Sequence, residues 1–269
     1  MNVLDEIVAE TRAAVARRAA AVPLPALIAA GEQRRGSGPG GMNSAIRDFK
    51  GALAAPGISL IAEHKRSSPS AGVIRADLEL ADVVGAYERG GARALSVLTE
   101  DARFGGALED LSAARRASSL PILRKDFIVG EYQVHESLAA GADAILLIVA
   151  ALDTGALIRL HSLATQLGLA TLVEVHDALE LDAAHEIGAE LVGINNRDLT
   201  TLEVDLRRTY ELLPQVRDGA LVVAESGFRA HGELEQLQAA GVDAVLIGEA
   251  LMRAGDVEAA TRELLGSKR

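Results

Sequence analysis

The sequence predicts an α/β fold, a (β/α)8 barrel of the TIM type that carries an N-terminal helical extension. Three observations predict it. Short apolar runs alternate with helical stretches from residue 58 onward, eight such runs occur within about 210 residues, and a glycine precedes every second run. Alternating strand and helix patterns give βαβ units and a parallel sheet. Eight units in this length are typical of a closed barrel.

An open doubly wound sheet is the alternative architecture for the same alternation. Its dinucleotide-binding fingerprint, G-x-G-x-x-G, does not follow the first predicted strand. The barrel is therefore the favoured prediction.

Residues 1–50 differ from the rest of the chain and come first. One helical face is indicated by four apolar residues: Leu4, Ile7, Val8 and Val15. Pro25 predicts the start of a second short helix, "PALIAA", which we expect to end at Gly31. "RRGSGPGG" from Arg34 has the composition of a flexible linker. A segment this short buries little alone, so we expect an extension of a single domain whose barrel spans residues 51–269.

The eight runs fall into two alternating sets. Four of them begin with a glycine: "GGARALSVL", "GADAILLIV", "GAELVGI" and "GVDAVLIG". These glycines are Gly91, Gly141, Gly188 and Gly241, spaced 50, 47 and 53 residues apart. Such spacing equals about two βα units, and glycine there predicts a left-handed helix C-cap. The other four runs are "ISLIAEHK", "LPILRKDF", "LATLVEVH" and "ALVVAESG".

The helix after the first strand has the clearest amphipathic pattern. Its apolar face is formed by Leu80, Val83, Val84 and Tyr87. Asp77 is the predicted N-cap, and Gly90-Gly91 the predicted stop.

Composition narrows the class of protein. The chain has 269 residues, 49% of them hydrophobic, a net charge of −11 and no cysteine. The acidic balance argues against nucleic-acid and anionic-membrane binding. Without cysteine there are no disulfides, thiolate metal sites or cysteine nucleophiles. The N-terminus lacks the apolar block of a signal peptide, and the longest apolar run, 144–152, is too short to cross a bilayer. We expect a soluble cytoplasmic protein.

The four runs of the second set share a charged end. These residues are Glu63 and Lys65, Lys125, Glu174, and Glu225. The simple explanation for one strand is that charge marks its exit to solvent. Four strands that all end this way favour a site, because the carboxyl ends of barrel strands meet on one face. Side chains alternate along a strand, so Glu63 and Lys65 point the same way and His64 the other. Neighbouring buried lysine and glutamate shift each other's pKa values, which can supply an acid and a base.

Polar residues and glycines also fall at the carboxyl ends of the predicted strands, which form the mouth of the barrel. In "GINNRDL", Asn195 can orient a hydroxyl or carboxylate and Arg197 can pair with a carboxylate, whereas an Asx-turn is the preferred reading of Asn196. Gly227 and Gly248 fall at the two strand ends that commonly form the phosphate site of such barrels. A phosphorylated substrate is therefore predicted.

Hydroxyl and aromatic side chains lie beside these positions in the sequence. Ser226 and the serine-rich turn after Lys65, with Ser68, can donate hydroxyl hydrogen bonds. Phe104 and Phe127 fit either core packing or an aromatic substrate.

These motifs resemble one family. "LIAEHKRSSPSAG", "PILRKDFIV", "GADAILLIV", "LVEVH", "GINNRDLTTLEVD", "VVAESGF" and "VLIGEALM" together, in order, are similar to indole-3-glycerol-phosphate synthase of tryptophan biosynthesis. That family converts 1-(2-carboxyphenylamino)-1-deoxyribulose 5-phosphate to indole-3-glycerol phosphate with loss of CO₂ and water. It needs no metal or organic cofactor, and its helical extension lies over the barrel mouth. The resemblance implies a small phosphorylated aromatic substrate. We expect a monomer, and contacts with other pathway enzymes stay open.

The resemblance also implies roles for the residues. Lys125 is similar to the general acid for ring closure, and Glu174 to its partner that stabilises the cationic intermediate. Lys65 would meet the substrate carboxylate or phosphate and act in dehydration, while Glu63 and Asn195 would hold hydroxyls. The remaining positions divide into a pocket around the substrate (Ser68, Phe104, Phe127, Leu146, Arg197, Leu199, Glu225 and Ser226) and a phosphate site (Gly227, Gly248 and Lys65).

Two other readings stay open at this level. One is a related phosphate-binding barrel of the same pathway, such as a phosphoribosylanthranilate isomerase-like protein. The other is a non-catalytic barrel that binds a phosphorylated metabolite. "EHKRSSPS" and "RKDF" argue against the first reading, and the complete set of charged strand ends argues against the second.

Overall fold

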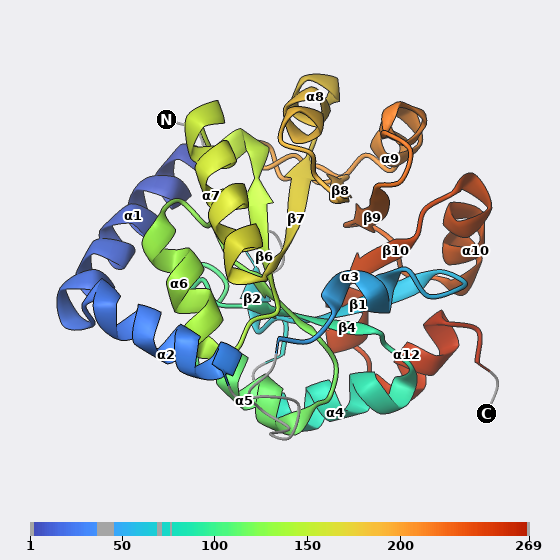
Figure 1. Cartoon of the computed structure of the whole chain (residues 1–269). Coiled ribbons are helices and arrows are strands. Elements are labelled where there is room, and N and C mark those ends of the chain that lie inside the picture. The colour runs from blue at the N-terminus through green and yellow to red at the C-terminus, as the bar shows by residue number, and fades with distance from the viewer. Residues whose placement is uncertain (1–2, 37–45, 69–71, 76, 268–269) are drawn as a thin grey trace.

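Eight parallel strands close into a barrel surrounded by helices (Figure 1). The computed structural model describes residues 3–36, 46–68, 72–75 and 77–267. Around the barrel, neighbouring strands follow the order β1-β10-β9-β8-β7-β6-β5-β4, which returns to β1. The strands are β1 (Ser59–His64), β4 (Ala94–Leu98), β5 (Ile122–Lys125), β6 (Ala144–Ile148), β7 (Ala170–Val175), β8 (Leu191–Asn195), β9 (Leu221–Glu225) and β10 (Ala244–Ile247). The predicted barrel is thus confirmed, and each of the eight predicted runs contains one strand.

Helices follow the strands and cover the outside of the barrel. They are α4 (Leu80–Gly90), α5 (Glu109–Ala117), α6 (Glu131–Ala140), α7 (Thr154–Leu167), α8 (Ala178–Glu186), α9 (Arg207–Leu212), α10 (His231–Ala240), α11 (Glu249–Met252) and α12 (Val257–Leu264). Two short 3₁₀ turns, η1 (Val149–Ala151) and η2 (Leu213–Gln215), and a small antiparallel pair, β2 (Ser67–Ser68) with β3 (Gly72–Val73), complete this part. Outward strand residues such as Leu95 and Val245 pack with helix residues such as Val84 and Leu111 in one buried cluster.

The repeated glycines act as the sequence predicted. Gly91, Gly141 and Gly241 are left-handed C-caps of α4, α6 and α10, with φ of 99°, 108° and 104°. Gly188 follows the end of α8 and has φ of 71°. Each glycine turns the chain from a helix into the next strand, because a left-handed residue reverses direction without a Cβ penalty.

Two predicted helix boundaries are wrong. The second helix, α2, runs from Leu24 to Gly36 and does not end at Gly31. A Cβ on Gly31 would lie only 2.8 Å from Cδ2 of Leu138, so the glycine permits close packing of α2 on α6. This packing outweighs the low helix propensity of glycine. For α4 the N-cap is Glu79, while Asp77 accepts a hydrogen bond from Arg75 at 2.9 Å.

The predicted linker also differs in its first residues. Arg34 lies within α2, is buried, and pairs with Asp143 at 2.7 Å. Its guanidinium also donates to the carbonyls of Leu138 and Ala142. The remainder of "RRGSGPGG", residues 37–41, lies outside the described residues.

The N-terminal helices contact the barrel in three places. α1 (Val3–Ala21) lies beside α6, and its buried Leu4 and Ile7 join the cluster that fills the barrel interior. α2 packs along α6 (Figure 1). The short α3 (Phe49–Leu53) lies at the amino ends of the strands, where Ser59 Oγ donates to the Leu53 carbonyl at 2.9 Å. The first turns of α1 and the whole of α3 therefore lie toward opposite ends of the barrel.

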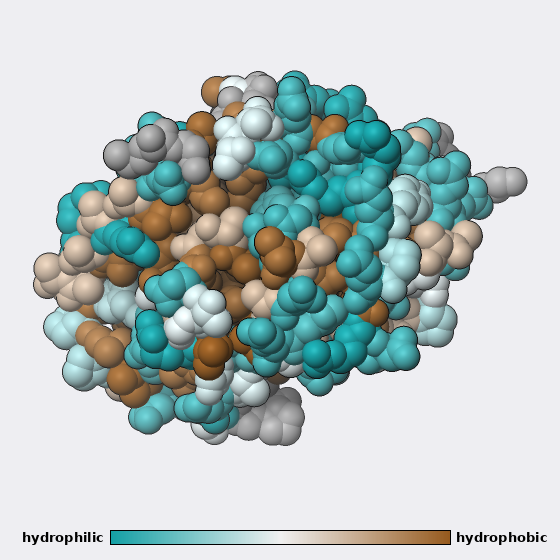
Figure 2. Space-filling model, turned by 90° about the horizontal axis from the view of Figure 1, so that it is seen from above, coloured by the Kyte–Doolittle hydropathy of each residue, from teal (hydrophilic) through white to brown (hydrophobic). Residues whose placement is uncertain are grey.

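The surface is mixed in character. Figure 2 shows hydrophobic residues gathered toward the centre and left of one face, with hydrophilic residues around them. Within the described ranges, no single helix is long and apolar enough to cross a membrane. Only α1 and α2 taken together reach the required length and hydropathy, and they are bent by 83° at the break between them.

Candidate active site

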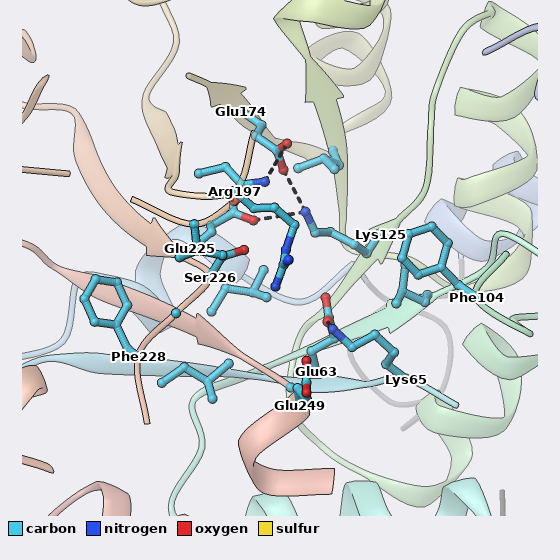
Figure 3. Close-up of a pocket in the computed structure, with 18 of the residues that line it drawn as sticks. Glu63, Lys65, Phe104, Lys125, Glu174, Arg197, Glu225, Ser226, Phe228 and Glu249 are labelled. Atoms are coloured by element: carbon cyan, nitrogen blue, oxygen red, sulfur yellow. Dashed lines mark hydrogen bonds and ion pairs between the residues drawn. The ribbon is translucent and has the colours of Figure 1, made fainter. Parts of the chain in front are cut away.

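The barrel interior changes from apolar to polar at one level. Inward-facing Ile61, Leu123, Leu172, Gly193 and Val223 are each followed two residues later by a polar side chain on the same face. These side chains are Glu63 (β1), Lys125 (β5), Glu174 (β7), Asn195 (β8) and Glu225 (β9). All five line one cavity of about 520 Å³ at the carboxyl ends of the strands (Figure 3). Strand periodicity thus brings together residues that lie as far as 162 positions apart in the sequence.

Lys125 is the centre of a buried ion cluster. Its Nζ lies 2.7 Å from Oε2 of Glu174 and 3.0 Å from Oε2 of Glu225 (Figure 3). Asn195 donates from Nδ2 to the other oxygen of Glu174 at 3.0 Å. The Glu174 and Glu225 side chains are 1% and 2% exposed, and Lys125 is 14% exposed. The Lys125 ammonium is therefore shared by two carboxylates, and Lys125 lines the cavity.

The pKa values in this cluster move apart. Burial would lower the pKa of Lys125, but the charges of Glu174 and Glu225 outweigh it and raise that pKa above its ordinary value. Burial would raise the pKa of Glu174, but Lys125 and His176 outweigh it and hold that pKa below its ordinary value. For Glu225, burial and the charge of Glu174 raise the pKa, the charge of Lys125 lowers it, and the net result is a pKa of about 7. The proton is thus held on Lys125, and Glu225 is the group of the three that titrates near neutrality.

His176 lies directly behind Glu174, and the sequence reading missed it. Nε2 of His176 is 3.5 Å from Oε1 of Glu174, and Nδ1 is 2.9 Å from Oε2 of Glu180. Glu180, on the first turn of α8, also accepts a hydrogen bond from the His176 amide at 2.7 Å. Burial would lower the pKa of His176, but the two carboxylates outweigh it and raise that pKa to about 10. His176 comes directly after β7, so its one sequence signal was its place two residues beyond Glu174.

Glu63 and Lys65 form the second charged pair. Nζ of Lys65 lies 3.0 Å from Oε1 of Glu63, and both residues line the cavity. Ser96 donates to Oε2 of Glu63 at 3.3 Å. His64 is buried and does not line the cavity, and burial together with the Arg66 charge lowers its pKa to about 4. The alternation expected along β1 is therefore present.

One side of the cavity is built from backbone and cations. Ser226 and Gly227 have successive positive φ angles of 66° and 98°, and Gly248 lies between β10 and α11. All three line the cavity together with Arg229 and Arg253, which the sequence reading missed. Arg253 pairs with Glu249 at 3.0 Å. The sequence signal for these two arginines was their distance from the glycines of the predicted phosphate loops. Arg229 follows Gly227 by two residues, and Arg253 follows Gly248 by five.

Another part of the cavity lining is apolar. It includes Phe104, Phe127, Leu146 and Leu199, all of them predicted from the sequence. Arg197 extends toward the middle of the cavity in Figure 3, and its Nη1 donates to the Leu202 carbonyl at 2.9 Å. This cavity therefore offers aromatic and aliphatic contacts as well as cations.

A smaller cavity of about 70 Å³ adjoins this apolar side. Leu4 and Ile7 of α1 line it, together with Phe104, Phe127, Arg197 and Lys65. Ser68 lines this smaller cavity and not the main one. The Pro69–Ser70 part of the serine-rich turn lies outside the described residues.

The two asparagines at the end of β8, Asn195 and Asn196, divide their roles differently from the expectation. Oδ1 of Asn195 accepts from the Arg197 amide at 3.0 Å, which is the local Asx contact. Asn196 instead bridges distant segments, because it accepts from the Thr209 hydroxyl at 2.8 Å and donates to the Ser226 carbonyl at 3.1 Å. Asn196 therefore fixes the loop that carries Ser226, and the predicted Asx-turn at this residue is wrong.

Within the described ranges, no group of three or more histidine, aspartate or glutamate side chains is placed to hold a metal ion. The expectation that the reaction needs no metal or organic cofactor stays a prediction.

Comparison with solved structures supports the fold. A 3-hexulose-6-phosphate synthase matches with a TM-score of 0.62 at 19% identity, covering 79% of this chain and 100% of that one. Thiamine phosphate pyrophosphorylase from Pyrococcus furiosus matches with a TM-score of 0.56 at 20% identity, covering 78% and 94%. At this identity the likeness concerns the barrel alone.

Comparison of sequences is more specific. The chain is 46% identical to indole-3-glycerol phosphate synthase of Rhodococcus jostii (strain RHA1) over 267 residues, which cover 99% of this chain and 96% of that protein. It is 47% identical to the protein of the same name from Aromatoleum aromaticum, with 98% and 99% covered. The indole-3-glycerol phosphate synthase family profile matches residues 4–264. This chain therefore belongs to the indole-3-glycerol phosphate synthase family.

Proposed function

We propose that the chain converts 1-(2-carboxyphenylamino)-1-deoxyribulose 5-phosphate to indole-3-glycerol phosphate, CO₂ and water. Family membership supports this reaction. The observation that carries the proposal is the position of the Lys125 ammonium, held between Glu174 and Glu225 in a cavity that is lined by apolar side chains as well as by cations and glycine backbone. Such a site suits a substrate with an aromatic ring, a carbonyl and a phosphate.

The two sides of the cavity suggest the orientation of the substrate. Backbone N–H groups of the Ser226–Gly227 turn and of Gly248, with the cations Arg229 and Arg253, suit the phosphate. The anthranilate ring then lies against the apolar residues Phe104, Phe127, Leu146 and Leu199. This orientation places the ribulose carbonyl between the two ends, above Lys125.

Ring closure begins at that carbonyl. The aryl carbon that carries the carboxylate attacks the carbonyl carbon, and the carbonyl oxygen takes a proton from Lys125. Because the carboxylates of Glu174 and Glu225 hold this proton in place, the ammonium is a charged donor before the oxyanion develops. The ring becomes cationic as the carbon–carbon bond forms, and the ionised Glu174 stabilises it. Release of CO₂ then returns the bonding electrons to the ring.

Dehydration follows on the same intermediate. The new hydroxyl leaves as water after it receives a proton, and loss of a ring proton completes the indole. Lys65 and Glu63 lie 3.0 Å apart on the same cavity, so they can supply the proton and accept the second one. Asn195 orients Glu174 and lies within reach of the substrate hydroxyls.

We further propose that residues 1–50 are a helical extension that covers part of the mouth. Leu4 and Ile7 support this role, since they meet Phe104 and Phe127 at the small adjoining cavity. Shortening Ile7 to alanine is expected to raise KM for the substrate with little change in kcat. An unchanged KM for Ile7→Ala would argue against the covering role.

A cytoplasmic monomer is the proposed working form. Membership of a biosynthetic family that acts on a phosphorylated small molecule supports this location. Sedimentation velocity on the purified protein tests the oligomeric state, and a stable dimer would overturn this part of the proposal.

The reaction itself is tested by product fluorescence. The chain contains no tryptophan, so the indole of the product emits against a low protein background. We expect an increase in indole emission that is proportional to enzyme and accompanied by one CO₂ per product. Binding of the substrate without turnover would favour the non-catalytic alternative.

A further inference from the structure

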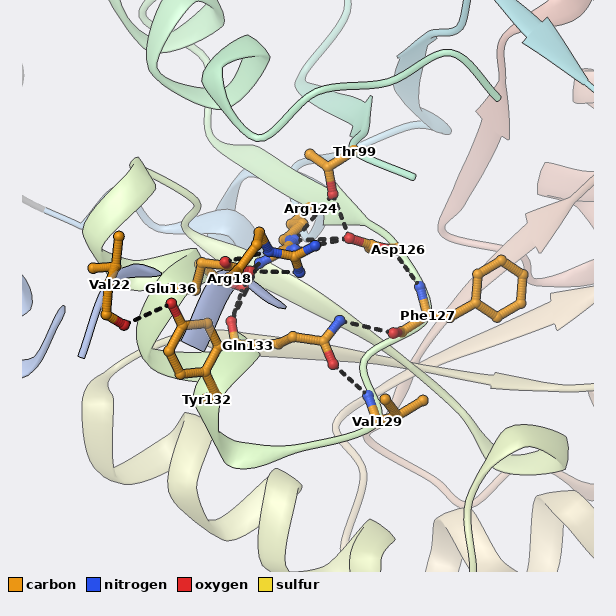
Figure 4. Close-up of polar contacts among 11 residues, drawn as sticks. Arg18, Val22, Thr99, Arg124, Asp126, Phe127, Val129, Tyr132, Gln133 and Glu136 are labelled. Atoms are coloured by element: carbon orange, nitrogen blue, oxygen red, sulfur yellow. Dashed lines mark hydrogen bonds and ion pairs between the residues drawn. The ribbon is translucent and has the colours of Figure 1, made fainter. Parts of the chain in front are cut away.

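A half-buried ion pair joins the N-terminal helix to α6. Arg18, near the end of α1, donates from Nε and Nη2 to the two carboxylate oxygens of Glu136, at 2.6 and 3.0 Å (Figure 4). The Glu136 side chain is 2% exposed and that of Arg18 is 36% exposed. A two-point guanidinium–carboxylate contact fixes direction as well as distance. Arg18 therefore sets the position of the Glu136 carboxylate from the solvent side.

Glu136 also contacts Arg124 of β5. Its Oε2 lies 2.9 Å from Nη1 of Arg124, whose side chain is 1% exposed. Arg124 in turn lies 2.8 Å from Oδ2 of Asp126 and donates to Thr99 Oγ1 at 3.0 Å (Figure 4). The charges alternate along the chain Arg18, Glu136, Arg124, Asp126, so the ion-pair chain carries no net charge. Such neutrality makes burial of its inner members tolerable.

The inner end of this ion-pair chain flanks Lys125 on both sides. Strand alternation directs Lys125 into the cavity and Arg124 outward toward α6. Asp126 Oδ1 accepts from the Phe127 amide at 2.8 Å, and Gln133 of α6 donates to the Phe127 carbonyl at 2.9 Å. The Lys125 carbonyl accepts from the Thr99 amide at 3.2 Å. The backbone that carries Lys125 and Phe127 is therefore held from outside the barrel.

Loss of Arg18 would change the position of the backbone that carries Lys125 and Phe127. Glu136 would retain Arg124 as its cation, and the pull of Arg18 would no longer oppose the attraction between Glu136 and Arg124. Arg124 would then shift toward Glu136 and away from Asp126, which fixes Phe127. Tyr132 provides a useful contrast, because its hydroxyl joins α6 to the Val22 carbonyl at 3.0 Å without entering the ion-pair chain.

We propose that the ion-pair chain Arg18–Glu136–Arg124–Asp126 makes α1 a positioning element for Lys125, so that the N-terminal extension sets the reach of this lysine into the cavity. Arg18 is then a positioning residue for the reaction, distinct from the residues that touch substrate. The kinetic part of this inference rests on the proposed function, in which Lys125 donates the proton.

The test compares three variants of the full chain with the parent: Arg18→Met, Arg18→Lys and Tyr132→Phe. A misplacement of about 1 Å can cost up to 10²-fold in rate. We therefore expect Arg18→Met to lower kcat by roughly tenfold, Arg18→Lys to recover part of that loss, and Tyr132→Phe to keep the parent kcat. Hydrogen exchange of the backbone in 122–128 is expected to quicken in Arg18→Met and to stay unchanged in Tyr132→Phe.

Two outcomes would overturn the inference. One is a parent-like kcat in Arg18→Met with only a lower Tm, which describes a structural anchor. The other is unchanged exchange in 122–128. If the parent itself shows no turnover, the proposed function fails, and the exchange measurement still decides whether Arg18 positions this segment.

Discussion

The ammonium nitrogen of Lys125 lies 2.7 Å from Oε2 of Glu174, although 49 residues separate the two in sequence. Their mutual attraction raises the pKa of the lysine and lowers that of the carboxyl, each against the effect of burial. The pair is thus ionised at neutral pH, with the proton held on Lys125. Glu225, which contacts the same ammonium, is the member with a pKa of about 7.

Replacing Lys125 by methionine should abolish most turnover while substrate still binds. The phosphate and ring contacts remain, but the proton donor to the carbonyl is lost, and general acid catalysis contributes about 10²–10⁴-fold. Substrate affinity is measured by calorimetry and kcat by indole fluorescence. Lys50→Met is the matched control, because Lys50 pairs with Glu190 on the surface, away from the cavity. A kcat for Lys125→Met within twofold of the parent would falsify the assigned role.

Glu225→Gln should become more stable relative to the parent as pH rises. The pKa of Glu225 is about 7 in the folded protein against 4.5 ordinarily, so between these values the folded state binds more protons than the unfolded state. Stability of the parent must then fall as pH rises through this window, by up to about 3 kcal/mol from this group. Glutamine cannot titrate, so the variant lacks this loss. Urea unfolding at pH 5 and pH 8 checks the difference, and parallel pH dependences would contradict it.

His176 should be protonated at pH 8. Its folded pKa of about 10 exceeds the ordinary 6.5, so its interaction with Glu174 and Glu180 stabilises the fold fully below pH 6.5 and is lost as pH rises through 10. His176→Asn should therefore be destabilised relative to the parent, most strongly near pH 6, and this difference should shrink toward pH 10. Nitrogen NMR shifts of the ring report protonation directly. His161, whose pKa burial lowers, is the internal control and should be neutral at pH 8.

Gly248→Ala should damage catalysis more than stability. A Cβ at this position would lie 2.8 Å from Oε1 and 2.9 Å from Cβ of Glu63, so Glu63 must move and its 3.0 Å contact with Lys65 must change. We expect kcat/KM to fall by about tenfold or more, since small misplacements at a site are costly. Gly232→Ala is the control, because nothing lies within 4 Å of its Cβ position in α10. Equal activities of the two variants would count against this role for Gly248.

Much of the fold and the location of the candidate site followed from local sequence patterns. The period of two along each strand and the glycine before every second strand depend on neighbouring residues alone, and both predictions hold. The polar level of the barrel could also be predicted, because residues at the ends of parallel strands meet wherever the barrel closes. Glu63, Lys125, Glu174, Asn195 and Glu225 indeed line one cavity.

What only the tertiary structure decided depends on partners far along the chain. Gly31 stays helical because Leu138 packs against it. Arg34 is buried because its guanidinium forms an ion pair with Asp143. The direction of each pKa shift depends on distances of about 3 Å between charged side-chain atoms on different strands. No local pattern contains these distances. Arg18 and Glu136 are 118 residues apart, and their contact exists only after α1 has docked on α6. The sequence by itself determined the periodicities and the residue types at the strand ends; closure of the barrel determined which charges face one another, because electrostatic energy depends on distance in space and not on separation along the chain.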